Sequence, residues 1–185
     1  MGAEQGLRGE ALRAAKRLGE RLDLVRREVE RALPLVMRRL EEYFGCRPSA
    51  EEVERYCLPL ILSTLHVVVH EVAHAAVERM VEGLELSARE REALHEVMAR
   101  LIERRLSIEL RERLGLSTVK VESFEEQVAE LSSYPELRGL RLAAEAYGEL
   151  YERFWRAVEE GKPVEDLVRE VLSSLEWEPA AEPQR

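Results

Sequence analysis

The sequence has little of several residue types on which other protein classes depend. Its 185 residues include no asparagine, three glutamines, two cysteines and only 5% aromatic residues. Two cysteines cannot form a four-cysteine metal site, and sparse strand formers exclude a large β-sheet. Cys46 and Cys57 are then either buried thiols or one disulfide, which intracellular proteins of hyperthermophiles do contain. Scarce thermolabile residues with abundant Glu and Arg are typical of a thermophile, although GC-rich codon usage would equally explain 25 arginines beside three lysines.

The chain also lacks an excess of positive charge and any long apolar run. A net charge of −9 at pH 7 argues against nucleic acid as a partner, because phosphate binding needs a basic surface. The longest uncharged run, residues 56–70 with histidines counted as neutral, is shorter than the about 20 residues that span a bilayer. The first ten residues, MGAEQGLRGE, contain no apolar core of a signal peptide. We therefore expect a cytoplasmic protein that binds neither nucleic acid nor membrane.

Apolar residues recur at three- and four-residue spacing along most of the chain, which predicts amphipathic helices. Ser49, Ser87 and Ser123 each stand three residues before a glutamate, as expected of capping boxes at helix starts. The expected helices span residues 10–44 with a bend or restart at Pro34, 49–58, 59–82, 87–114, 123–131, 135–160 and 164–177. Only residues 116–122 show the alternation of a strand.

These elements predict a mostly α fold. We expect about seven helices around a buried central helix that carries the sequence HEVAH, with at most one or two short strands. Residues 1–177 are expected to form a single α-rich domain, in which an N-terminal helical segment, 1–45, precedes a core of residues 49–177. Residues 178–185 are expected to be a disordered tail.

The central helix carries His70, Glu71 and His74 in the pattern HExxH. On a helix, residues four apart lie one turn apart on the same face, so both imidazoles can approach one zinc ion at about 2.0–2.1 Å. Glu71 lies about 100° round the helix from His70 and about 60° from His74. Its carboxylate is therefore expected beside the metal position, where it can accept a proton from water.

Apolar residues surround this motif on every side, which indicates a buried helix. Two histidines and a glutamate on such a helix are costly unless a metal ion or hydrogen bonds compensate for their burial. Both kinds of compensation fit the sequence. His66 lies about 12 Å along the helix axis from His74, too far for the two to share one zinc ion, so we expect His66 to be a buried histidine.

HEVAH resembles the active-site helix of the zincin metallopeptidases, over these five residues only. The resemblance implies Zn²⁺ as cofactor, a peptide or protein as substrate, and residues 49–177 as a zincin-like core. It also implies that zinc and Glu71 activate a water that attacks a peptide carbonyl, with Glu71 passing the proton to the leaving amine. The metzincin extension is absent, because Val77 and Met80 stand where that group has glycine and histidine.

Gluzincins take their third zinc ligand, a glutamate, from a later helix. Several gluzincin-like peptidases carry it in a pattern of the form aromatic-x-E-G-x-A-E. Residues 124–130, FEEQVAE, are similar to this pattern apart from Gln127 in the glycine position. The resemblance implies Glu126 as the third ligand and Glu130 as the acid that orients a ligand histidine. The alternative for Glu126 is the capping box with Ser123, which would turn its side chain back onto the backbone.

Other residues are weaker candidates for the site. Glu145, followed one turn later by Glu149, is the next candidate for the third ligand, and His95 is the one after that. His95 and Tyr147 could also stabilise a developing oxyanion. Packing within the helical core would account for both side chains equally well.

Two functions other than a peptidase fit the same residues. One is a metal-binding protein without catalytic activity, and the other is a helical interaction or scaffold protein with buried histidines. Zincins usually hold substrate along the edge of a β-sheet, and this chain offers only residues 116–122 as such an edge. Metal content would separate the scaffold from the other two functions, and replacement of Glu71 would separate the peptidase from the non-catalytic metal protein.

Overall fold

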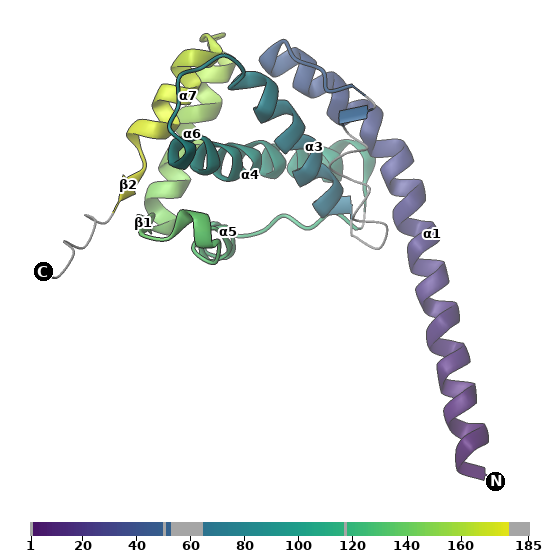
Figure 1. Cartoon of the computed structure of the whole chain (residues 1–185). Helices are drawn as coiled ribbons and strands as arrows, with labels where there is room; N and C mark the ends of the chain where they lie inside the picture. Colours follow the sequence, from purple (N-terminus) through teal and green to yellow (C-terminus); the bar gives the residue numbers. More distant parts are fainter. Residues whose placement is uncertain (1, 50, 53–64, 117, 178–185) are drawn as a thin grey trace, which may run out of the picture.

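The computed structural model describes residues 2–49, 51–52, 65–116 and 118–177. Within these ranges lie six α-helices and two short strands, which confirms the predicted mostly α fold (Figure 1). The helices are α1 (Gly2–Phe44), α3 (Leu65–Met80), α4 (Ala88–Leu114), α5 (Phe124–Leu131), α6 (Ala144–Glu159) and α7 (Val164–Ser173). Strands β1 (Leu140–Arg141) and β2 (Glu176–Trp177) pair antiparallel, and a 3₁₀ turn at Pro135–Leu137 precedes β1. Most of the expected helix at 49–58 lies outside the described residues, as does Pro59, the expected start of the motif helix.

Helices α3 and α4 form the centre of the molecule and make the most extensive contact between any two described elements. Helix α4 is buried along most of its length, through Ala93, Leu94, Val97, Met98, Leu101, Ile102, Leu106 and Leu110. The C-terminal half of α1 packs against both central helices, whereas α7 packs against α4 and α6 (Figure 1). None of the described helices combines the length and the apolar composition that crossing a membrane requires.

Helix α1 runs unbroken through Pro34, so the expected restart at this residue does not occur. Pro34 is exposed to solvent, while Ala32, Val36 and Leu40 on another face of the same helix are buried in the core. This burial stabilises the helix across the proline. The helix ends at Gly45, as predicted, because Gly45 adopts a φ of +63° that side chains other than glycine rarely tolerate.

Sequence signals set the ends of the helices that carry the site. The Ser87 hydroxyl accepts the backbone N–H of Glu90, and the Glu90 carboxylate accepts the backbone N–H of Ser87, which closes the predicted capping box at the start of α4. Gly115, with a φ of +60°, ends α4 as predicted. Ser123 and Glu126 form the same reciprocal pair at the start of α5.

Two predicted helices are shorter in the structure than in the sequence analysis. The expected helix 135–160 is divided at Gly139, whose φ of +85° no α-helix can contain, and α6 begins only at Ala144. The expected helix 164–177 ends at Ser173, and Glu176–Trp177 pairs with Leu140–Arg141. The apolar spacing continues through both interruptions, but the backbone groups there are satisfied by strand pairing.

The predicted strand at 116–122 is not formed in the described residues of that segment. Its polar groups pair with side chains of neighbouring helices: the backbone N–H of Thr118 donates to Glu28 of α1 at 2.9 Å, and Arg104 of α4 donates to the carbonyl oxygen of Glu122. With these partners the segment needs no neighbouring strand. The predicted tail and Cys57 lie outside the described residues, so the tail's disorder stays a prediction. Cys46 is a free, partly buried thiol, so of the two alternatives the structure does not favour the disulfide.

Candidate metal centre

Charged and polar residues meet in the middle of the apolar interface between α3 and α4. His70 and His74 come from α3 and are each 8% exposed. Glu96 and Glu103 come from α4, with Glu103 opposite His70 and Glu96 opposite His74. The numbering rises along one helix and falls along the other, so the two helices run antiparallel at the site. The four-residue spacing of the histidines puts both imidazoles on the face that α4 covers.

The two imidazoles converge with one carboxylate on a common point. His70 Nε2 and His74 Nε2 are 3.0 Å apart, and Glu96 Oε1 lies 3.7 Å from His74 Nε2. One ligand atom from each of the three residues lies within 4.8 Å of the other two, which makes this a group that could hold a metal ion. Tetrahedral zinc with Zn–N bonds of about 2.0–2.1 Å keeps its ligand atoms about 3.3 Å apart, and the separations of 3.0 and 3.7 Å lie on either side of that value.

Glu96 contributes to this group a carboxylate oxygen that has no hydrogen-bond partner among the described residues. This oxygen, Oε2, is buried. Burial raises the pKa of Glu96, and the negative charge of Glu71 raises it as well, whereas His70 and Arg100 lower it. A buried carboxylate oxygen without a partner is costly in free energy. A cation bound between Glu96 and the histidines would remove that cost.

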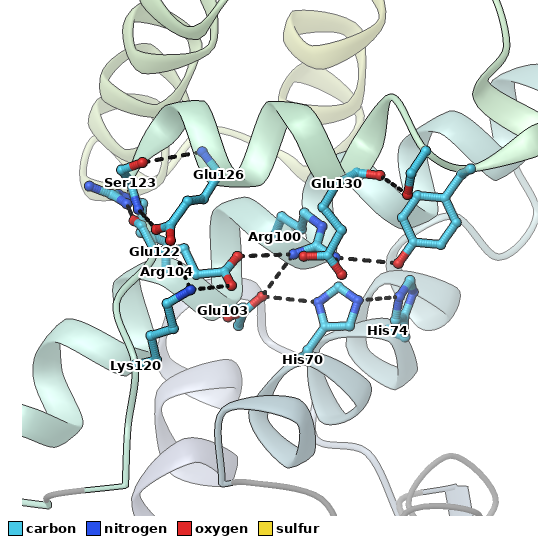
Figure 2. Close-up of polar contacts among 12 residues, drawn as sticks. His70, His74, Arg100, Glu103, Arg104, Lys120, Glu122, Ser123, Glu126 and Glu130 are labelled. Carbon is cyan, nitrogen blue, oxygen red and sulfur yellow. Dashed lines mark hydrogen bonds and ion pairs between the residues drawn. The ribbon is translucent and has the colours of Figure 1, made fainter.

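The second ring nitrogen of His70 is held by Glu103 (Figure 2). His70 Nδ1 lies 3.1 Å from Glu103 Oε2, and Glu103 is 1% exposed. A carboxylate accepts only, so Nδ1–H is the donor, and Nε2 is the ring nitrogen that faces His74. Burial, and after it the nearby charge of His70, lowers the pKa of His74 to about 3. His74 therefore presents the neutral imidazole that metal binding requires.

Glu71 lies beside this group and is not one of its members. It is half-buried on α3, and burial raises the pKa of its carboxyl group. Its negative charge contributes to the raised pKa of Glu96 on α4. The structure leaves Glu71 outside the candidate group, and its role as a base stays a prediction.

The structure does not bring Glu126 or Glu145 to the histidines. The Glu126 carboxylate accepts the backbone N–H of Ser123 at 2.8 Å and the ammonium of Lys120 at 3.0 Å. The capping box and this exposed ion pair therefore take the side chain that the sequence analysis expects at the metal. Glu145 is exposed in the first turn of α6. Among the described residues, the acidic member of the candidate group is Glu96 instead.

Glu130 is connected to His70 only through other residues. Its carboxylate lies 2.7 Å from Arg100 Nη2. Arg100 Nη1 in turn lies 3.9 Å from the carboxylate of Glu103, which holds His70 (Figure 2). The acid that contacts a ligand histidine directly is therefore Glu103, and Glu130 stands two contacts further away.

His95 and Tyr147 occupy different surroundings from each other. The His95 ring is stacked on His74, with centroids 6.0 Å apart and ring planes 15° apart, and burial lowers its pKa. Tyr147 is fully buried and packs edge-on against Phe124. Its hydroxyl has no hydrogen-bond partner among the described residues. His95 therefore borders the candidate group, whereas Tyr147 lies within the helical core.

The sequence contains a signal for Glu96 and Glu103 that the motif alone does not reveal. Glu96, Arg100 and Glu103 are spaced by four and three residues, so they share one face of α4. Their neighbours on the buried side include Val97 and Leu101, both fully buried. A charged stripe inside the apolar part of a long helix is expensive unless it meets polar partners. Searching for such a stripe opposite HExxH would have identified both residues.

Comparisons with known proteins give no independent indication of what the site does. The chain matches no protein-family model, no curated protein and no solved structure.

Proposed function

We propose that the protein is a zinc-dependent peptidase in which His70, His74 and Glu96 hold the metal and Glu71 acts as the general base. The observation that carries the proposal is the convergence of two imidazole nitrogens and one carboxylate oxygen within 4.8 Å of one another. The resemblance of HEVAH to the zincin active-site helix supports it. Glu96 replaces Glu126 as the third ligand in this proposal.

The donor set favours zinc in a catalytic role. Two imidazoles and one carboxylate are ligands typical of catalytic zinc, which keeps its fourth position open for water or substrate. His70 carries the further feature of such sites, a carboxylate on the ring nitrogen that does not face the metal. When bound, zinc supplies Lewis acidity, which polarises a carbonyl group and makes water a better nucleophile at neutral pH.

Each of the other steps of the reaction would depend on a residue of the chain. Glu71 accepts a proton from the water that attacks the peptide carbonyl and then donates it to the leaving amine. Glu103 keeps the ring of His70 in one orientation and one tautomer. His95, stacked on His74, borders the site and is available to the developing oxyanion. The substrate is a peptide or protein, and no nucleic-acid or membrane partner is proposed for this acidic chain in the cytoplasm.

A metal-binding protein without catalytic activity is the second candidate function. It is favoured by the small size of the described sheet, in which each strand has two residues. Such a sheet is too short to hold an extended peptide along its edge, and the described part of 116–122 forms no strand. A peptidase built on this site would have to hold its substrate with helices and loops.

The peptidase proposal is tested with the untagged protein and a mixture of fluorogenic peptides. We expect cleavage that 1,10-phenanthroline abolishes and added Zn²⁺ restores, because the metal supplies the Lewis acid. The non-chelating isomer 1,7-phenanthroline serves as the control and should leave cleavage unchanged. Zinc-loaded protein that cleaves no peptide, or cleavage that survives complete removal of metal, would contradict the proposal.

A further inference from the structure

Arg100 is a buried cation at the centre of an ion-pair cluster behind the candidate metal site. The residue is 2% exposed and lies on α4. Its guanidinium lies 2.7 Å from Glu130, 3.6 Å from Glu122 and 3.9 Å from Glu103. The hydroxyl of Tyr134 is a further partner, 3.3 Å from Nη2. One guanidinium thus connects α4 with α5 and with the segment before α5 (Figure 2).

The planar fork of arginine suits this position. It carries five N–H donors in fixed directions and keeps its charge at any relevant pH, whereas lysine offers a single charged nitrogen. Burying a lone cation or a lone carboxylate costs several kcal/mol, and removing one partner from a buried pair leaves the other uncompensated. Arg100 and Glu103 therefore depend on each other, while Glu130 and Glu122 place two further carboxylates around the same guanidinium.

We propose that Arg100 is a positioning residue that couples His70 to helix α5. Glu103 holds His70 Nδ1 at 3.1 Å, and Arg100, one helical turn before Glu103 on the same face of α4, places its positive charge 3.9 Å from that carboxylate. On its other side the guanidinium is held by Glu130 of α5. The orientation of a metal-binding imidazole is thereby tied to the docking of α5, so a change in α5 alters metal affinity without any contact with the metal.

A purely structural role for Arg100 makes different predictions. In that case the ion pairs would only fasten α5 onto α4, and their loss would lower thermal stability without altering His70. Spatial proximity does not distinguish the two roles, because coupling requires that both ends respond to the same change. The proton position on His70 distinguishes them, since fastening of α5 alone leaves the His70–Glu103 hydrogen bond intact.

The first test is the tautomer of His70 in metal-free protein, read from long-range ¹H–¹⁵N NMR correlations of the imidazole. In the wild type we expect a single tautomer with the proton on Nδ1, as the contact with Glu103 requires. Arg100→Met should give a mixture of tautomers and weaken zinc binding about 10–100-fold, the range for partners of ligand histidines. Arg100→Lys should fall between the two, because it keeps the charge and loses the fork.

The second test uses a surface variant that does not endanger folding. The Glu130 side chain is 45% exposed, so Glu130→Gln removes one charge with little change of shape. We expect its zinc dissociation constant to rise about threefold, as for the loss of a partly exposed ion pair. Glu125→Gln, at another exposed position on α5, is the matched control and should bind zinc like the wild type.

The tautomer and affinity measurements test the role of Arg100 separately from the peptidase proposal. The affinity measurements rest on the proposed metal site, but the tautomer of His70 is observed without metal or substrate. Arg100→Met protein that is folded, keeps a single Nδ1–H tautomer and binds zinc like the wild type would overturn the inference. If Arg100→Met does not fold, equal zinc affinities for Glu130→Gln and Glu125→Gln would overturn it. Failure of the wild type to cleave peptides would leave the tautomer result standing.

Discussion

Glu71→Gln is expected to leave the protein folded and zinc-loaded while it lowers kcat for peptide hydrolysis by about 10²–10⁴-fold, the usual contribution of a general base. Glutamine has nearly the same shape as glutamate but cannot accept a proton at neutral pH. Glu71 lies beside His70 in sequence and is not a member of the candidate metal group. Its replacement should therefore remove the base and retain the three ligands.

The matched control is Glu82→Gln, at an exposed position in the turn after α3. This variant should hydrolyse peptides like the wild type, because Glu82 lies beyond the helix that carries the motif. Zinc content and the thermal unfolding curve are measured for both variants, so that a loss of metal or fold is not mistaken for a loss of the base. A Glu71→Gln enzyme that hydrolyses peptides at the wild-type rate would exclude the proposed mechanism.

Glu96→Ala is expected to weaken zinc binding by more than about 100-fold, beyond the range for a residue that only supports a ligand. The physical reason is the loss of one of three donor groups from the site. Glu96 Oε1 lies 3.7 Å from His74 Nε2, and its Oε2 is buried without a hydrogen-bond partner among the described residues. Titration of apoprotein with zinc against a competing chelator gives the dissociation constant.

Glu126→Ala provides the comparison for this prediction. Its carboxylate closes a capping box and pairs with Lys120, so its loss should lower the melting temperature slightly and leave zinc affinity unchanged. The opposite pattern, strong loss of zinc with Glu126→Ala and none with Glu96→Ala, would restore Glu126 as the third ligand. A large and equal loss of zinc affinity in both variants would identify neither glutamate as the third ligand.

Local sequence signals were sufficient to predict much of the fold. Capping boxes at Ser87 and Ser123, together with Gly115, gave the bounds of α4 and α5, because these residues satisfy helix-end groups within a few positions of the chain. Apolar spacing gave the mostly α class. The division of 135–160 was not predicted, because β1 forms only with a partner strand at Glu176–Trp177 that lies far away in the sequence.

The sequence predicts the site residues that lie on α3, but not those that lie on α4. His70, Glu71 and His74 are visible because helical periodicity fixes their relation to one another. Glu96 and Glu103 come from a second helix, and their place opposite the histidines depends on how α4 docks against α3. The match to the gluzincin pattern favoured Glu126, but at that position the local hydrogen bonds of a helix start determine where the side chain lies.

The metal content of the freshly purified, untagged protein is the most direct test of the proposed zinc site. Elemental analysis should find about one zinc per chain, as expected for a site with three protein ligands. His70→Ala and His74→Ala should each lose it, because each removes one of the two converging imidazoles. No transition metal in the wild type, and no uptake on titration with Zn²⁺, would contradict the central claim.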